Sequence, residues 1–362
     1  MSSGLRIGII GTGMMGREHI RNLKLTPQAR VVALADPHEP SLAAALETLG
    51  PSAEGVATHR DAGALLAAGG VDAVLIVSPN HTHREVLETA FAAGVHILCE
   101  KPLCTTLEDA RWVAERAARS PQVFWTGMEY RFMPPAARLV ADVHAGRIGP
   151  LRMLSLREHR FPFLEKVGDW NRFGANTGGT MVEKCCHFFD LMRLVTRAEP
   201  LRVFCSGARD VNHLNERYDG RTPDIIDNSF TVVDFEGGVR AMLDLCMFAD
   251  GSVEQEEIVA VGDLAKIETS IPRGELTWSP RTPYGGVKRP VSEIVEVEPA
   301  ALEAGTHHGA TLFQLRAFLA ACSGEGPVQV TAEDGLRAVA MGLAAERSAK
   351  ERRVVEMSEL GV

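Results

Sequence analysis

The sequence predicts an α/β protein with an N-terminal domain built on a doubly wound parallel sheet and a C-terminal α+β domain with a large, mainly antiparallel open sheet. Three observations support this prediction. A short apolar run, Leu5 to Ile10, ends in a glycine-rich turn, and segments typical of strands and helices then alternate as far as Met128. Beyond that residue, strand-like runs follow one another with few helices between them. Alternation indicates a parallel sheet and succession an antiparallel one. We expect domains at 1–128 and 129–362.

The composition is typical of a globular protein large enough for about two domains. Of 362 residues, 45% are hydrophobic and 23% are charged, with a formal net charge of -9. An acidic chain without a basic run repels a phosphate backbone, so we expect no nucleic-acid partner. No run approaches the roughly 18 apolar residues of a membrane span, and the N-terminus has no signal-peptide core. We therefore expect no membrane association and a cytoplasmic location.

The glycine-rich turn fits the pattern G-x-G-x-x-G of dinucleotide-binding Rossmann sheets. Gly11 permits the tight turn, Gly13 lets a pyrophosphate approach the backbone, and Gly16 lets the next helix pack closely. The N-terminus of that helix would point free N–H groups at a phosphate. A second apolar run ends in Asp36, 20 residues beyond Gly16, where an acidic side chain would bind both hydroxyls of an adenine ribose. The pattern predicts NAD rather than NADP, because Asp36 would repel a 2'-phosphate.

The remaining elements of the N-terminal domain follow from periodicity and from the residues that end each run. We expect helices at 16–25, 41–49, 61–68, 81–93 and 105–119, and strands at 31–35, 73–77, 95–99 and 123–126. Ligands of such sheets bind beyond the carboxyl ends of the strands, which would gather several motifs in one crevice. The residues expected at the cofactor are Gly11, Thr12, Gly13, Met14, Met15, Gly16, Asp36, Ser78, Pro79, Asn80, His83, Glu100 and Lys101.

The C-terminal domain is predicted to contain one open sheet. We expect helices at 135–145, 311–322 and 332–350, strands at 152–159, 201–207, 228–235, 239–248, 257–261 and 265–269, and a loop at 279–299. A sheet with helices on one face leaves the other face to be covered, and self-association is the usual solution. We therefore expect a homodimer or homotetramer.

The sequence Glu100-Lys101-Pro102 directly follows a buried strand. A lysine there could meet a substrate hydroxyl near the nicotinamide, and Pro102 could hold an unusual backbone turn such as a cis peptide. The alternative is a solvated Glu–Lys pair that starts a loop. The seven cysteines show neither a C-x-x-C pair nor a zinc spacing, so we expect no metal site and a side-chain base as the proton acceptor.

A second group of ionisable residues lies in an otherwise apolar segment from Gly178 to Asp190. As one helix, this segment places Glu183, His187 and Asp190 within about 60° of arc, with Lys184 about 60° beyond His187. Unpaired buried charge is costly, so such a stripe needs either a function or an internal ion-pair network that satisfies itself.

Several motifs in this order resemble the glucose-fructose oxidoreductase, inositol dehydrogenase and rhizopine catabolism family (Gfo/Idh/MocA). They are Gly11 to Gly16, Ser78-Pro79-Asn80-His81, Glu100-Lys101-Pro102, the Gly-Gly then acidic-x-x-x-His segment, and Val330 to Gly335. The resemblance implies an N-terminal Rossmann domain, a C-terminal domain whose open sheet mediates dimers or tetramers, and oxidation or reduction of a secondary alcohol on a sugar or cyclitol. By resemblance, Lys101 matches the lysine of the family's Glu-Lys-Pro motif, and His187 matches the histidine of its helix motif.

This chain departs from the family pattern at two positions. Glu183 falls where many members have Asp, and Lys184 is an additional cation beside it. We expect Lys101, His187, Glu183 and Lys184 to be catalytic, the last two by holding the proton network. The residues expected at the substrate are Lys101, Trp170, Arg172, Glu183 and His187.

Three functions remain open on the sequence. The first is an NAD-dependent dehydrogenase of a sugar, glycoside or cyclitol. The second is a glycoside hydrolase that uses bound NAD for transient oxidation, and the third is a non-catalytic NAD-sensing protein. His307, which precedes a helix, could reach the site or cap the helix, whereas His19 is expected to be a packing residue.

Overall fold

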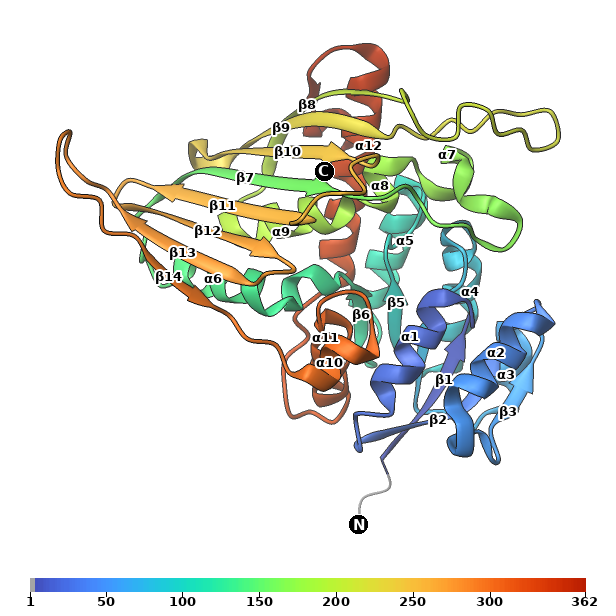
Figure 1. Ribbon diagram of the computed structural model, residues 1–362. Helices are drawn as coiled ribbons and strands as arrows, with labels where there is room; N and C mark the ends of the chain where they lie inside the picture. The colour runs from blue at the N-terminus through green and yellow to red at the C-terminus, as the bar shows by residue number, and fades with distance from the viewer. Residues whose placement is uncertain (1–3) are drawn as a thin grey trace. The chain divides into compact units, whose positions relative to one another are not determined.

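The structure, a computed structural model, describes residues 4–362 and contains two compact units (Figure 1). The first unit runs to Glu129 and adds Lys166–Trp170 and Glu298–Val339; the remainder of the chain forms the second unit. The sequence predicted two consecutive domains, 1–128 and 129–362. In the structure, the segment Glu298–Val339 packs with the first unit, where its helices α10 (Pro299–Ala304) and α11 (Ala310–Cys322) contact α1 (Met14–Leu23).

The first unit is a doubly wound α/β unit, as predicted. Its six parallel strands have the order β3-β2-β1-β4-β5-β6, with the switch point between β1 and β4. The strands are β1 (Leu5–Ile10), β2 (Ala29–Ala35), β3 (Ala57–His59), β4 (Ala73–Ile76), β5 (His96–Glu100) and β6 (Phe124–Gly127). The helices are α1 (Met14–Leu23), α2 (Glu39–Leu49), α3 (Ala62–Ala68), α4 (His83–Ala93), α5 (Leu107–Ala118), α10 (Pro299–Ala304) and α11 (Ala310–Cys322).

The central strands β1 and β4 are apolar where both of their faces are buried. All four residues of β4 and the last four of β1 are buried. Strand β3 was not expected, since it is only three residues long and carries no apolar run. It forms at the sheet edge by pairing with β2.

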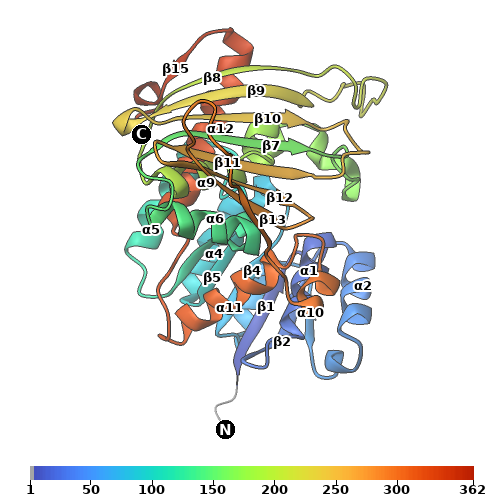
Figure 2. The ribbon, with the colours of Figure 1, turned by 60° about the vertical axis from the view of Figure 1, so that its left-hand side comes forward.

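The second unit contains one nine-stranded sheet of order β14-β13-β12-β11-β7-β10-β9-β8-β15 (Figures 1 and 2). Its pairs are antiparallel except for β7 with β10, which confirms the mainly antiparallel prediction. The strands are β7 (Leu151–His159), β8 (Pro200–Ala208), β9 (Asn228–Phe235), β10 (Arg240–Cys246), β11 (Glu256–Gly262), β12 (Ala265–Ile271), β13 (Glu275–Pro280), β14 (Val291–Ile294) and β15 (Val355–Glu356).

Part of the expected loop at 279–299 is a strand. Strand β14 pairs with β13 at the edge of the sheet, and all four of its residues are exposed. An exposed edge strand has no buried face, so the alternation that identifies a strand in a sequence is missing here. Its backbone bonds to β13, rather than its side chains, define it.

Helices α6 (Pro134–His144) and α9 (Cys186–Thr196) pack against this sheet. Alternate residues of the strands accordingly point into a core, as in β9, where Ser229, Thr231 and Val233 are buried and the residues between them are not. The exposed residues on the strands include Phe204, Phe230, Val232 and Met242. Val232 pairs with both Phe204 and Met242 across adjacent strands, which makes this a continuous apolar surface.

The predicted helix over 178–190 is wrong in one respect, because it is divided in two. Helix α8 (Thr180–Glu183) ends before Lys184, and α9 begins at Cys186. The amide of Cys185 donates to the carbonyl of Thr180, five residues back, which widens the helical turn at this point. A widened turn rotates Glu183 and His187 away from the relation that one regular helix would give them.

The longest helix, α12 (Ala332–Glu351), contributes to both units. It carries charged side chains along its length, among them Glu333, Arg337 and Glu346. Within residues 4–362, no helix has the length and apolar character needed to cross a membrane.

Candidate active site

The turn after β1 has the shape that its glycines allow. Gly11 has a φ of 96°, and a Cβ there would collide with the backbone of Val77 and Ser78. A Cβ at Gly16 would collide with the carbonyl of Gly11, so α1 can pack against the turn only at a glycine. An ideal Cβ at Gly13 meets no atom of the described chain within 4 Å. The second glycine therefore faces open space, as approach of a pyrophosphate requires.

Asp36, at the end of β2, is already oriented by the glycine-rich turn. Its Oδ2 accepts hydrogen bonds from the amide of Thr12 at 2.7 Å and from the hydroxyl of the same residue at 3.1 Å. Its Oδ1 accepts one from the amide of His38 at 2.9 Å. Each carboxylate oxygen has further lone pairs, so the group can still accept ribose hydroxyls. The unit thus fits the adenosine half of NAD.

The turn after β4 holds Ser78, Pro79 and Asn80. Asn80 is buried, and its amide Nδ2 has no hydrogen-bond partner within residues 4–362. A buried donor of this kind fits a ligand acceptor, because an unsatisfied buried amide is costly. Asn80 therefore supports the predicted cofactor site.

His83 lies behind these turns and is fully buried. Its Nδ1 lies 2.9 Å from the carbonyl of Pro102, and its Nε2 lies 3.1 Å from the carbonyl of Ser78. Burial lowers the pKa of His83, and a neutral ring donates through one nitrogen at a time. These contacts place His83 between the ends of β4 and β5, and its assignment to the cofactor stays a prediction.

Lys101 lies at the end of β5, half-buried, and the Lys101–Pro102 peptide is cis, as the sequence suggested. The preceding Glu100 is buried and binds Nε2 of His19 at 2.7 Å. Its other oxygen accepts a hydrogen bond from the amide of Lys101 at 3.2 Å. Burial raises the pKa of Glu100, but His19 and Lys101 outweigh burial and leave the pKa lowered. His19 is therefore more than a packing residue, because it holds the carboxylate beside Lys101.

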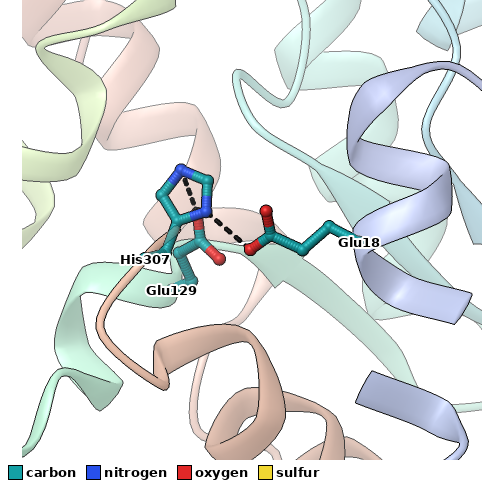
Figure 3. Close-up of side chains that lie close together, drawn as sticks. All are labelled: Glu18, Glu129 and His307. Carbon is teal, nitrogen blue, oxygen red and sulfur yellow. Dashed lines mark hydrogen bonds and ion pairs between the residues drawn. The ribbon is translucent and has the colours of Figure 1, made fainter. Parts of the chain in front are cut away.

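A cluster of Glu18, Glu129 and His307 lies in the same unit (Figure 3). The Nδ1 of His307 lies 2.8 Å from Glu18, its Nε2 lies 3.6 Å from Glu129, and the hydroxyl of Thr311 contacts both carboxylates. Burial raises the pKa of Glu18, but His307 and Thr311 bring it down to about 2; burial raises the pKa of Glu129. These contacts make an internal ion-pair network. His307 belongs to it and does not cap α11, whose N-cap is Gly309.

In the second unit, His187 is buried in the first turn of α9. Its imidazole stacks on the ring of Tyr130 with centroids 4.0 Å apart and planes at 5°. Glu183 is buried at the end of α8. Asp190 accepts two hydrogen bonds from the guanidinium of Arg131, so this member of the predicted ionisable stripe serves an ion pair.

Lys184 enters a buried polar cluster that we define as Glu158, Glu256, Lys184 and Tyr130. Its Nζ lies 2.8 Å from Glu158 and donates a hydrogen bond to the hydroxyl of Tyr130 at 2.5 Å. That hydroxyl donates in turn to Glu256 at 3.1 Å. Burial lowers the pKa of Lys184, although Glu158 opposes this effect. The ammonium is thus committed to the interior of the second unit.

The two residues expected to bind substrate from the loop before α8 lie in different units. Trp170 belongs to the first unit and contacts the ring of His81 edge-on at 5.9 Å. Arg172 is buried in the second unit, where its Nε donates to Glu216 at 3.0 Å. This contact ties Arg172 to the segment between β8 and β9, and its binding of substrate hydroxyls stays a prediction.

Tyr130, Glu158 and Glu256 were not identified from the sequence. A signal for the two acids was present in the alternation of the strands. Glu158 continues the inward series Leu154 and Leu156, and Glu256 begins a second inward series. An acid at an inward position indicates a buried polar cluster. Tyr130 carries no comparable signal, because it lies in a short turn between elements.

Comparisons with known proteins agree with both halves of this description. Residues 5–128 match a family described as "Oxidoreductase family, NAD-binding Rossmann fold", and residues 141–357 match its C-terminal alpha/beta domain. The chain is 28% identical to the rhizopine catabolism protein MocA of Rhizobium meliloti, over 94% of this chain and 93% of the relative. It is 27% identical to a myo-inositol 2-dehydrogenase of Thermotoga maritima, over 98% and 99%. A crystal structure of a probable dehydrogenase from Thermotoga maritima superposes with a TM-score of 0.78 at 27% identity, over 98% and 100%.

Proposed function

Because the chain belongs to the Gfo/Idh/MocA family of NAD-binding oxidoreductases, we propose that it is a dehydrogenase that oxidises a secondary alcohol of a cyclitol, sugar or glycoside. The observation that carries the proposal is the first unit's open turn at Gly13 beside the oriented carboxylate of Asp36. Lys101 follows at the end of a strand in the same unit. The carboxyl ends of parallel strands are where such sheets bind their ligands.

The residues that would hold NAD follow from this geometry. The N–H groups at the start of α1 suit the pyrophosphate, Asp36 suits the ribose, and the amide of Asn80 suits an acceptor on the ligand. When bound, the nicotinamide supplies the acceptor for the hydride that leaves the alcohol carbon. The protein supplies position and manages the proton.

We propose that Lys101 and His187 together manage the proton of the substrate hydroxyl. As the alcohol carbon is oxidised, its hydroxyl must lose a proton, and a side-chain base in reach must accept it. Either residue can be that base, with the other donating a hydrogen bond to the substrate oxygen. Glu183 would hold the proton network beside His187, while Lys184 acts from the buried polar cluster.

The names of two relatives support the proposed substrate class. One is named a myo-inositol 2-dehydrogenase and another a rhizopine catabolism protein, so cyclitols are the first candidates for this chain. Glu183 departs from the Asp of the family pattern that the sequence resembles, and its additional methylene would reshape a substrate pocket. Sugars and glycosides therefore remain in the substrate set.

We also propose that the protein self-associates through the exposed face of the second unit's sheet. Phe204, Phe230, Val232 and Met242 are side by side on neighbouring strands. Phe230 keeps 63% of its surface exposed. Contiguous apolar surface of this kind marks an interface, and a second copy of the chain would bury it in a homodimer or homotetramer.

A substrate screen with isotope labelling tests the function. The protein is incubated with NAD and with cyclitols, aldoses or glycosides that carry deuterium at the ring carbons. We expect reduced nicotinamide that contains the deuterium, and a ketone of the substrate. Cleavage of a glycoside without accumulation of reduced nicotinamide would favour the hydrolase reading, and tight NAD binding without turnover of any alcohol would favour a sensor.

A further inference from the structure

The ring of Tyr130 lies flat against the imidazole of His187. The two planes are 5° apart, and both residues are buried. Tyr130 comes from the short turn Glu129–Phe132, and His187 comes from α9, so the contact joins segments distant in sequence. A stacked partner restricts rotation of the imidazole about its Cβ–Cγ bond, because that rotation would tilt the ring out of the stack. Tyr130 thereby limits the directions in which the two ring nitrogens can point.

The hydroxyl of Tyr130 is fixed in turn by Lys184. The ammonium donates to this hydroxyl at 2.5 Å and forms an ion pair with Glu158 at 2.8 Å. A lysine normally keeps much rotamer freedom, whereas this one has two partners and is 5% exposed. Lys184, Tyr130 and His187 therefore form a continuous column of contacts.

The sheet below this column explains why a cation is present. Glu158 of β7 and Glu256 of β11 are directly paired across the two strands, and both are buried. Like charges opposite each other in a sheet are destabilising. Lys184 and Arg160 compensate Glu158, while burial raises the pKa of Glu256. The ion pair with Glu158 thus fixes the ammonium of Lys184, and this ammonium in turn fixes the Tyr130 hydroxyl.

We propose that Tyr130 is a positioning residue for His187, and that Lys184 acts on His187 through the Tyr130 hydroxyl. The proposal deepens the proposed function, on which it rests for the reaction that His187 serves. It assigns Lys184 no contact with substrate. Its distinguishing consequence is that removal of the hydroxyl and removal of the ammonium break the same link.

Four variants separate the ring, the hydroxyl and the cation. Tyr130→Leu removes the stack, whereas Tyr130→Phe keeps the ring and removes the hydroxyl. Lys184→Met is paired with Glu158→Gln, so that no buried carboxylate is left without its cation. We expect Tyr130→Leu to lower kcat about tenfold or more, with the KM values for NAD and alcohol within about twofold, since misplacement of a catalytic group affects turnover. The variant that combines Tyr130→Phe with Lys184→Met/Glu158→Gln should have a kcat no lower than that of the slower of the two variants it combines. Both sets of changes remove the same hydrogen bond between Lys184 and Tyr130, so their effects should not multiply.

Imidazole ¹⁵N spectra provide a readout that does not require turnover. The His187 signals are assigned with His187→Gln, and we expect them to shift in Tyr130→Phe while those of the exposed-residue control Tyr284→Phe stay in place. The proposal is overturned if Tyr130→Leu keeps its kcat, if the effects of the hydroxyl and cation variants multiply, or if the His187 signals in Tyr130→Phe do not move. If the wild-type protein oxidises no alcohol, the proposed function fails, and the spectra alone decide the proposal.

Discussion

The two units hold their candidate functional residues in place by different means. In the first unit, backbone turns at the ends of parallel strands present Gly13, Asp36 and Asn80, and the main chain provides most of the contacts. In the second unit, His187 is supported by side chains, namely the ring of Tyr130 and the buried polar cluster beneath it. This difference predicts which property a substitution in each unit should affect. Changes to the turns should weaken cofactor binding, and changes to the side-chain support should slow turnover.

The largest effect is expected from His187→Ala, which tests the second unit alone. Loss of an acid–base group lowers kcat by about a hundredfold or more. The affinity for NAD, measured by calorimetry, should remain within about threefold of wild type. A fall in NAD affinity that matches the fall in kcat would break the comparison between the units.

Asp36→Asn tests the first unit. The amide keeps an acceptor for the Thr12 contacts but removes the charge that repels a 2'-phosphate. We expect the ratio of kcat/KM for NADP to that for NAD to rise at least about tenfold, which corresponds to about 1.4 kcal/mol. An unchanged ratio in initial-rate measurements would show that Asp36 does not select the cofactor.

Glu346→Gln sharpens the account of side-chain support in the second unit. Glu346 accepts a hydrogen bond from the amide of Met181 at 2.9 Å, at the start of α8, and burial raises its pKa to about 7. A raised carboxyl pKa favours the protonated form in the folded state. The contribution of Glu346 to the free energy of unfolding is therefore fully present below its unfolded pKa of about 4.5, and it is lost as the pH rises through its folded pKa of about 7.

The neutral variant should escape this loss. We expect the free energy of unfolding of Glu346→Gln at pH 8 to exceed that of the wild type by up to about 3 kcal/mol, so that the variant unfolds at a higher denaturant concentration. Near pH 4.5 the two proteins should differ little. Urea titrations at both pH values measure the difference. An equal change at the two pH values would mean that the charge of Glu346 has no part in it.

The smallest effect on the site is expected from Phe230→Asp. The new charge lies on the exposed apolar face of the sheet, so it should dissociate the assembly while NAD affinity stays the same. Sedimentation at micromolar concentration should show a monomer for Phe230→Asp, whereas Val253→Asp, at an exposed position outside the strands, should keep the assembly of the wild type. A wild-type monomer would contradict self-association.

The fold of the first unit could be predicted from the sequence, and each of its candidate site residues follows a local signal. Gly11, Gly13 and Gly16 are recognised by spacing, Asp36 by its distance from them, and Lys101 by the strand that precedes it. The doubly wound parallel sheet followed from the alternation of strands and helices, whereas its edge strand β3 did not. The exception was Glu298–Val339, because the return of a distant segment leaves no local trace.

The second unit was predicted in outline only. Its support for His187 depends on partners from β7, β11 and the turn at Tyr130, which no spacing in the sequence relates to α9. The helix that carries His187 was expected, but the widened turn at Cys185 was not, since it depends on which carbonyl accepts one amide. Arg172 shows the same limit: its residue type suits hydroxyl binding, and its partner Glu216 is known only from the fold.

Lys101→Ala tests the central claim most directly, because Lys101 lies in the unit of turns yet is assigned to proton transfer. Kcat is measured with the best substrate of the screen, and NAD affinity is measured by calorimetry on the same preparation. The account predicts a fall in kcat of about a hundredfold or more, with NAD affinity nearly unchanged. A variant that keeps its kcat, or that fails because NAD no longer binds, would contradict the role assigned to Lys101.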